Sequence, residues 1–330
     1  MNITVLFTGG TIGSKLHVGG IGTDSEAKRE LLHRYRLESG DEAVFKTAAP
    51  YTILSENLTC AHLTALARAV RDAATTADAV IVTLGTDTLP FVAAALSYIR
   101  GLSAKPVVLV SSNYVLDDTR ANGVCNFRAA VDFLRATRDA CGVYVSYRNT
   151  DEPTRILRAS RLLSHLAPTD TVYTLNGTVA VWDNGSITQN TAYKECADGQ
   201  PPLAAEDLQK ATGRVLFLRV HPAMQYPTLS QTTAAVLMET YHSGTLPTAT
   251  KELQDFSASA KAKGIPLFAV GITGEATYES ANLYPALGIT PLPPLSPVAA
   301  YMKLLLAVAN SLDLKATLSR PLGGDMDRVP

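Results

Sequence analysis

Short, uninterrupted runs of apolar residues recur through the first half of the chain, with helix-like segments between them. The runs cover residues 3–7, 79–84, 107–110 and 143–147, and a further strand-like segment covers 43–54. A continuous apolar run of this length is typical of a strand that is covered on both faces. Apolar residues at helical spacing predict helices over 25–37, from Thr59 onward and over 122–140. This alternation predicts a parallel sheet with helices on both faces.

After Tyr147 the pattern changes to shorter strands and then to a second, smaller strand-and-helix unit. Strands are predicted at 172–175 and 179–182, and Asn184-Gly185 is typical of a type I′ hairpin turn. The polar stretch 190–213 resembles a linker. Beyond it, the predicted strands cover 215–220, 236–241 and 267–272, and the predicted helices cover 250–263 and a segment from Ser296. We therefore expect two domains, 1–190 and 214–330, joined by a linker over 191–213.

Size and charge narrow the classes of function. The chain has 330 residues, of which 46% are apolar and 18% charged, as in a compact soluble protein. A net charge of −1, with no basic block, gives little electrostatic support for nucleic-acid binding. No apolar run approaches the ~20 residues that cross a bilayer, so no membrane partner is expected. The first residues form a strand and not a secretory signal, so we expect a cytoplasmic protein.

The four cysteines, Cys60, Cys125, Cys141 and Cys196, are far apart in the chain. No two of them form a CxxC pair, which argues against a zinc site and against a redox pair. We expect four reduced thiols that serve packing.

Candidate chemistry gathers where the predicted parallel strands end. The clusters are Gly9-Gly10-Thr11 after 3–7, Gly85-Thr86-Asp87 after 79–84, Ser111-Ser112 after 107–110 and Ser55-Glu56 after 43–54. The carboxyl ends of parallel strands meet at one edge, where open α/β sheets bind ligands, so these clusters are expected to line one crevice. Two threonines that face a carboxylate favour acyl transfer, in which one hydroxyl attacks and another group relays a proton. The backbone N–H groups of Gly10, Thr11 and Thr86 are candidate oxyanion donors.

Each cluster also has a plainer interpretation. Gly9-Gly10 alone fits a tight turn, and 86–88 and Ser55-Glu56-Asn57 fit helix caps. A glycine-rich turn after a strand can also cradle the phosphates of a dinucleotide, but Asp24 lies too early for the acid that usually binds the ribose. The clusters together are more specific than any one of them.

Taken together, these segments resemble the bacterial-type L-asparaginases over most of the chain. Residues 8–13 resemble the family's first signature, which implies that Thr11 is the acyl-accepting nucleophile. Residues 85–89 resemble the second signature, which implies that Thr86 is the second catalytic threonine and that Asp87 holds the substrate's amino group. The resemblance further assigns substrate binding to Gly10, Gly85, Ser55, Glu56, Ser112 and Thr245.

The resemblance also implies the architecture. The family has an α/β fold, with a larger flavodoxin-like N-terminal domain built on a parallel sheet and a smaller C-terminal α/β domain. Its sites are completed across a dimer, often within a tetramer, by a segment that resembles residues 241–245. We therefore expect a homodimer or homotetramer with sites near the subunit interface.

Two departures from the family pattern concern the first threonine. Leu84 stands where the family usually has histidine, and the segment 19–22 stands where the family's lid carries a tyrosine. The first tyrosine of this chain is Tyr35. His17 lies in the expected lid, at 14–24, and is an alternative base, because histidine titrates near neutral pH.

A third departure concerns the second threonine. The family pairs it with a lysine, but the matching segment, 155–161, contains none. Arg158 fits the position best, and Arg161 is the next choice. A guanidinium stays protonated in proteins, so Arg158 could hold Asp87 as an ion pair but could not accept a proton.

The resemblance thus implies an amidohydrolase that converts L-asparagine to L-aspartate and ammonia through a threonine acyl-enzyme, with no metal or cofactor. Its partner would be a small amino-acid substrate. One alternative is another amide, such as glutamine. A second is the amidase subunit of a tRNA-dependent amidotransferase, against which the lack of an extra N-terminal domain argues. A third is an amino-acid-binding or regulatory protein that kept the pocket and lost turnover. The missing tyrosine and lysine favour this alternative.

Overall fold

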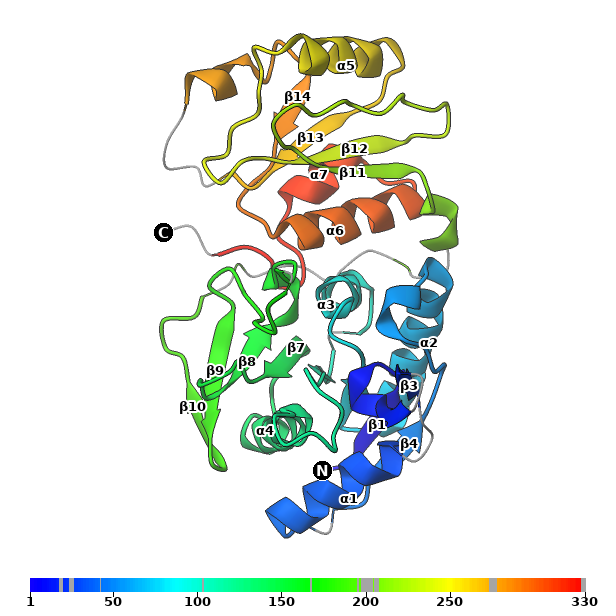
Figure 1. The fold of residues 1–330 in the computed structure, drawn as a ribbon, viewed down its shortest axis with the longest axis vertical. Helices are drawn as coiled ribbons and strands as arrows, with labels where there is room; N and C mark the ends of the chain where they lie inside the picture. The colour runs from blue at the N-terminus through cyan, green and yellow to red at the C-terminus, as the bar shows by residue number, and fades with distance from the viewer. Residues whose placement is uncertain are drawn as a thin grey trace.

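The computed structural model describes residues 1–17, 20–23, 27–41, 43–102, 104–166, 168–194, 196, 204, 208–272 and 278–327. Helices α1 to α7 cover Ala27–Ser39, Cys60–Thr76, Leu89–Tyr98, Gly123–Ala136, Lys251–Ala262, Pro297–Ala309 and Leu314–Ser319. Strands β1 to β14 cover Ile3–Phe7, Ser14–His17, Gly20–Thr23, Lys46–Ala48, Ala79–Thr83, Pro106–Val110, Gly142–Tyr147, Thr154–Arg158, Thr178–Asp183, Ser186–Gln189, Val215–Arg219, Ala235–Glu239, Leu267–Val270 and Ile289–Pro291. Most of these strands belong to two sheets, which lie one above the other in Figure 1.

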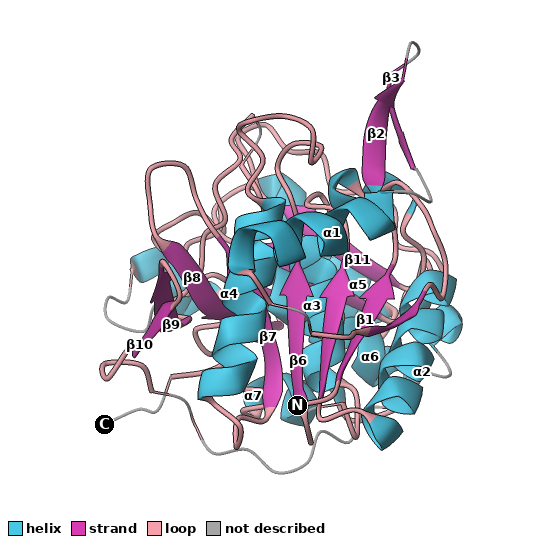
Figure 2. Ribbon diagram, turned by 90° about the horizontal axis from the view of Figure 1, so that it is seen from below, coloured by secondary structure: helices cyan, strands magenta, loops and turns pink. Residues whose placement is uncertain are grey.

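The larger sheet has the strand order β10-β9-β8-β7-β6-β5-β1-β4. The neighbours from β4 to β7 pair in parallel, in the order that flavodoxin-like folds use. β8, β9 and β10 extend this sheet as antiparallel strands. In Figure 2 the arrows of β7, β6 and β1 point the same way. The predicted α/β fold with a flavodoxin-like parallel sheet is confirmed, and the parallel strands deliver their carboxyl ends to one edge.

Each central strand is buried on both faces, as its continuous apolar sequence predicts. In β5, Val80 and Val82 pack into an apolar cluster with α2 and α3. Ala79 and Ile81, which alternate with them, pack into a second cluster with α1 and α4. Because successive side chains of a strand point to opposite faces, a helix layer on each face requires apolar residues at every position.

The smaller sheet has the order β11-β12-β13-β14 and is parallel throughout. Helix α6 lies between the two sheets in Figure 1 and packs against α3. One apolar cluster includes residues of α3 and α6 together with Leu237 and Phe268 of the smaller sheet. The two sheets therefore share a core. The domain limits at 190 and 214 remain a proposal, and residues 195, 197–203 and 205–207 of the expected linker lie outside the described residues.

Two predicted strands are shorter in the structure than the sequence indicated. In 43–54 only β4 is a strand, after which Ile53 makes an isolated bridge to Gly9. Pro50 interrupts this segment, since proline cannot donate to a ladder of backbone hydrogen bonds. In 172–175 only Thr174 pairs, through a single bridge to Leu162. The predicted turn at Asn184-Gly185 is confirmed, with φ of +46° and +94° between β9 and β10.

The segment expected to be a lid loop contains an antiparallel hairpin of β2 and β3. Figure 2 shows this hairpin projecting on the side to which the parallel strands point. Residues 18–19 and 24, and the side chain of His17, lie outside the described part of the chain. The lid and the role of His17 as a base therefore stay predictions.

Candidate functional site

A glycine contact joins the ends of β1 and β5. Gly10 has φ of +72°, a conformation that residues with a Cβ rarely adopt. A Cβ on Gly10 would lie 2.1 Å from the backbone nitrogen of Gly85. Thr11 begins a short 3-10 turn directly after this contact, and Thr86 follows Gly85. The two glycines thus bring both predicted catalytic threonines onto touching segments of backbone.

The backbone N–H of Gly10 is already used within the fold. It donates to the carbonyl oxygen of Ile53 at 2.9 Å, and the carbonyl of Gly10 accepts from the Ser14 hydroxyl at 2.8 Å. The prediction that the Gly10 N–H binds an oxyanion is therefore wrong. Gly10 serves the site by allowing the close approach to Gly85, and the N–H groups of Thr11 and Thr86 remain the predicted donors.

Ser55 reaches the same edge from the chain that follows β4. The Ser55 hydroxyl donates to the Asp87 carboxylate, with 2.8 Å between Oγ and Oδ2. Gly85 makes room for it, because a Cβ on Gly85 would lie 2.5 Å from the Ser55 Oγ. Glu56 is the next residue of the same short turn and is exposed. The structure thus brings seven predicted site residues together at this edge: Gly10, Thr11, Ser55, Glu56, Gly85, Thr86 and Asp87.

Thr86 and Asp87 line a cavity of about 380 Å³. The rest of its lining carries no motif that predicts a site from the sequence, and consists of Tyr147, His165, Pro168, Thr169 and Asp170. The Nε2 atom of His165 is buried and has no hydrogen-bond partner among the described residues. This cavity therefore places a histidine beside two predicted catalytic residues.

The surroundings of His165 act on its pKa in opposite directions. Burial lowers the pKa below the ordinary value of 6.5, and the negative charges of Asp87 and Asp170 raise it. Burial has the larger effect, so the net shift is downward. The imidazole is therefore largely uncharged at neutral pH, and an uncharged imidazole has one nitrogen that can accept a proton.

The loop that carries His165 is closed at its base and held to β7. The N–H of Leu163 donates to the carbonyl of Tyr173 at 3.0 Å. The hydroxyl of Tyr147, at the end of β7, donates to the carbonyl of Asp170 at 2.9 Å. Burial raises the pKa of Tyr147 to about 12, so this hydroxyl keeps its proton at neutral pH. These bonds fix the loop against the end of the parallel sheet.

Arg158 lies towards the opposite end of the larger sheet, which contradicts its predicted catalytic role. β8 runs antiparallel to β7, so Arg158 pairs with Tyr144 near the start of β7, whereas Tyr147 at the end of β7 lines the cavity. The guanidinium lies 5.2 Å from the centre of the Tyr144 ring. A Cβ on Gly142 would lie 2.2 Å from Nη1 of Arg158. Arg158 therefore packs at the end of the sheet where the parallel strands begin, away from the site.

Arg161, the next choice for the missing lysine, holds the C-terminal segment. Its side chain is only 1% exposed and donates to the carbonyls of Gly324 at 2.7 Å and Met326 at 2.8 Å. It also forms an ion pair with Asp327. These bonds use the guanidinium for structure.

Ser112 is buried at the end of β6, and its hydroxyl has partners on both sides. It donates to the carbonyl of Tyr114 at 2.6 Å and accepts from the N–H of Gly123 at 3.1 Å. The hydroxyl is thus used within the fold, and the predicted contact of Ser112 with the substrate stays a prediction. Ser112 joins the end of β6 to the start of α4, beside the site.

Thr245 lies after β12, on the smaller sheet. Its hydroxyl pairs with that of Ser243 at 3.0 Å, and its carbonyl accepts from the N–H of Tyr241 at 3.0 Å. These bonds stay within its own loop. The expected reach of this loop into a neighbouring subunit requires a second copy of the chain and stays a prediction.

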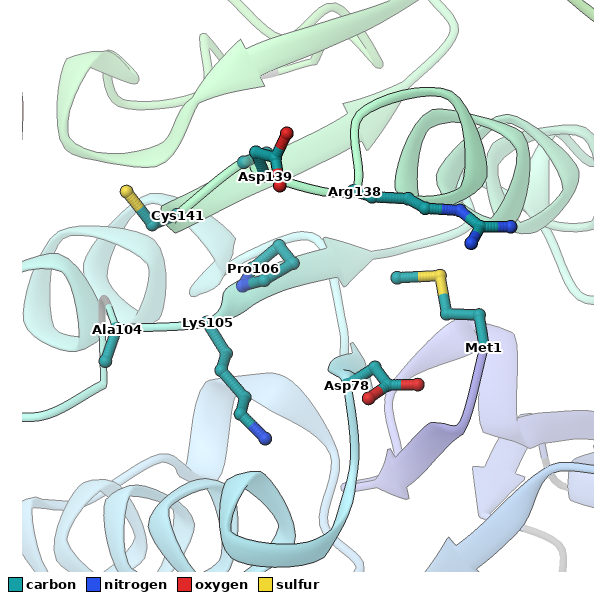
Figure 3. Close-up of a pocket in the computed structure, with 9 residues that line it drawn as sticks. Met1, Asp78, Ala104, Lys105, Pro106, Arg138, Asp139 and Cys141 are labelled. Carbon is teal, nitrogen blue, oxygen red and sulfur yellow. The ribbon is translucent and has the colours of Figure 1, made fainter.

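A pocket of about 450 Å³ lies at the amino ends of the parallel strands (Figure 3). Its lining includes Met1, Asp78, Lys105, Arg138 and Cys141. None of the predicted site residues lines it, so it is separate from the cluster at the carboxyl ends.

Within the described ranges, no three His, Cys, Asp or Glu side chains are grouped so that they could hold a metal ion. All four cysteines are free thiols, as predicted, but Cys141 is exposed and so does not serve packing as expected. No helix in the described part of the chain is long and apolar enough to span a membrane.

Residues 2–176 match the family model described as "Asparaginase, N-terminal". An L-asparaginase from Thermococcus kodakarensis is 23% identical over 337 residues, which cover 99% of each chain. A glutamyl-tRNA(Gln) amidotransferase subunit from Pyrococcus furiosus is 26% identical over 336 residues, which cover 95% of this chain and 73% of that protein.

Two solved structures have the same fold. The thermostable L-asparaginase from Thermococcus kodakarensis matches with a TM-score of 0.80 and 22% identity over 100% of both chains. A probable cytoplasmic L-asparaginase from Campylobacter jejuni matches with a TM-score of 0.72 and 21% identity, over 96% of this chain and 98% of that one.

Proposed function

Because the chain belongs to the asparaginase family of amidohydrolases, we propose that it hydrolyses the side-chain amide of L-asparagine to give L-aspartate and ammonia. The observation that carries this proposal is the contact between Gly10 and Gly85, which sets Thr11 and Thr86 on touching backbones. A nucleophilic hydroxyl needs a second group within reach to manage its proton, and this contact supplies the proximity.

In the proposed reaction, the Thr11 hydroxyl oxygen attacks the amide carbon. The hydroxyl proton passes to the leaving nitrogen, the C–N bond breaks, and ammonia leaves an ester on Thr11. Water then attacks the ester carbon, and its proton returns to the Thr11 oxygen as the ester bond breaks. Asp87 and Glu56 bind the amino-acid end of the substrate, and Ser55 orients Asp87 through its 2.8 Å hydrogen bond. The reaction needs no metal and no cofactor.

The first test is the release of ammonia from asparagine by Thr11→Ala. We expect kcat to fall by at least ~10³-fold, because removing a nucleophile eliminates the covalent route. Thr86→Ala should lower kcat by at least ~10²-fold, the usual contribution of a group that manages a proton. Thr75→Ala, which changes an exposed threonine at the end of α2, is the control and should behave like the wild type. Turnover like that of the wild type in Thr11→Ala would contradict the proposal.

A second candidate substrate is glutamine or a glutaminyl group, and the similarity to the amidotransferase protein favours it. The ratio of kcat/KM for asparagine and glutamine distinguishes the two substrates, since specificity is a ratio of these constants. Saturable binding of both amides without turnover would instead support an amino-acid-binding protein.

We also propose a cytoplasmic homodimer or homotetramer whose sites lie near the subunit interface, with Thr245 contributing from a neighbour. The likeness to the probable cytoplasmic L-asparaginase supports the location. The family resemblance supports the assembly. A mass in solution equal to that of one chain would contradict the assembly.

A further inference from the structure

His165 carries a buried nitrogen that the fold does not use. Its Nε2 atom has no hydrogen-bond partner among the described residues, although buried polar atoms are nearly always paired. A buried group without a partner costs folding free energy, so its presence calls for an explanation. The cavity that His165 lines provides one, because Thr86 and Asp87 line the same space.

The groups that face His165 come from three parts of the fold. Asp87 comes from the turn between β5 and α3, Tyr147 from the end of β7, and Asp170 from the loop of His165 itself. Tyr147 donates its hydroxyl to the carbonyl of Asp170 and keeps its proton at neutral pH. Both aspartates act on His165 as negative charges. An imidazolium formed in this cavity would therefore be stabilised by two carboxylates.

We propose that Nε2 of His165 accepts the proton of the Thr86 hydroxyl during amide hydrolysis, in the position for which the sequence offers no lysine. In acylation, the Thr86 oxygen takes the proton of Thr11 as its own proton passes to His165. The imidazolium then returns that proton through Thr86 to the leaving nitrogen, which departs as ammonia. In the second half, the proton comes from the attacking water and returns to the Thr11 oxygen.

This role suits histidine better than the arginines of the sequence analysis. A guanidinium stays protonated and cannot accept a proton, and Arg158 and Arg161 lie in other parts of the fold. Burial keeps the His165 imidazole uncharged near neutral pH, as a proton acceptor must be before the reaction. His165 acts through Thr86 and is therefore a positioning residue. The inference rests on the proposed function and adds to it the group that controls the second threonine.

The test compares His165→Gln with the wild type, with ammonia release measured from pH 4.5 to 9. For a wild type that relies on neutral His165, kcat should rise with pH and level off above the pKa of that histidine. In His165→Gln we expect kcat to fall by ~10²- to 10⁴-fold, the usual range for general-base catalysis, with KM little changed. The rise of kcat with pH on the acid side of the profile, called the acid limb below, should be lost. His33→Gln, an exposed histidine of α1, is the matched control.

His165→Lys tests the same idea without removing the base. The ordinary pKa of lysine is about 10.4, so the acid limb should move to higher pH and activity should return as the amine loses its proton. A merely structural role would not move the limb. If circular dichroism shows that His165→Gln is unfolded, the proposal is tested by His165→Lys and by the NMR titration of His165 in the wild type.

The outcomes separate this inference from the proposed function. Ammonia release that Thr11→Ala abolishes but His165→Gln leaves unchanged, with the acid limb intact, would overturn the role of His165 and keep the hydrolase. An NMR titration that shows His165 already protonated at pH 7 would also overturn it. A folded wild type that releases ammonia from neither asparagine nor glutamine would overturn the proposed function, and this inference with it.

Discussion

Two regions of the molecule bury ionisable side chains, and they differ in how fully the polar atoms are paired. Between α3, α6 and the C-terminal segment, the side chains of Lys303 and Asp325 are both 0% exposed and form an ion pair at 2.8 Å. The Tyr98 hydroxyl donates to the Asp325 carboxylate at 2.9 Å, and the N–H of Leu322 donates to it at 3.0 Å. At the edge of the larger sheet, by contrast, Nε2 of His165 has no partner in the described chain.

This difference distinguishes a network that stabilises the fold from a cavity that suits proton transfer. In the Lys303 network the partners compensate the buried charges, so the network holds α6 and the C-terminal segment in place. His165 lines a cavity of about 380 Å³ with two carboxylates near it, and its unused nitrogen is buried. A titratable group with a perturbed pKa and charged neighbours in a cavity is a candidate for proton transfer.

The largest expected effect is on the free energy of unfolding, at the network of Lys303 and Asp325. Lys303→Ala should lower the free energy of unfolding by about 3–5 kcal/mol, because it leaves the Asp325 charge buried without its partner. Urea denaturation measures this loss. Lys251→Ala breaks an ion pair with Asp255 that has a similar geometry but is exposed on α5, so it should cost far less. An unchanged unfolding curve for Lys303→Ala would remove the contrast between the two regions.

The next largest effect is on activity, at the cavity that Asp87 and His165 line. Asp87→Asn should lower kcat/KM by ~10- to 150-fold, the equivalent of one charge-assisted hydrogen bond of about 1.5–3 kcal/mol. Asp87 is exposed, so the free energy of unfolding should change little. The negative charge of Asp87 raises the pKa of His165, so its removal should move the acid limb of the rate to lower pH. A limb that moves to higher pH would contradict the link between the two residues. Asp72→Asn, on the exposed face of α2, is the control.

The smallest expected effect on activity is at Arg158. Arg158→Gln should leave kcat and KM like those of the wild type, because the guanidinium lies against Tyr144 and Gly142 at the far edge of the sheet. The free energy of unfolding should fall, since the contact with the Tyr144 ring is lost. Kinetics and thermal melting measured on the same preparation separate the two effects. A fall in kcat with unchanged melting would return Arg158 to the site.

The sequence was informative where the local pattern decides the structure. The apolar runs of β1, β5 and β6 require cover on both faces, and this requirement alone predicts a parallel sheet with its carboxyl ends at one edge. The glycines after β1 and β5 then locate Thr11 and Thr86, because only residues without a Cβ fit there.

The sequence was less informative where strand direction and long-range contacts decide the structure. The family resemblance predicts Arg158 at the position of the missing lysine, but β8 runs antiparallel and carries its last residue away from the site. His165 lies in a loop without periodicity, and its closeness to Asp87 arises only when the sheet forms. Ser112 had the right place on the sheet, but its hydroxyl is taken up by Tyr114 and Gly123.

The contact between Gly10 and Gly85 has a consequence for engineering this protein. A methyl group on Gly10 would meet the backbone of Gly85, which cannot rotate away, and a methyl group on Gly85 would meet the side chain of Ser55. A library that varies one signature segment and keeps the other would therefore lose members for steric reasons, whatever their chemistry. The two segments behave as a single unit, and a graft onto another scaffold would have to carry both.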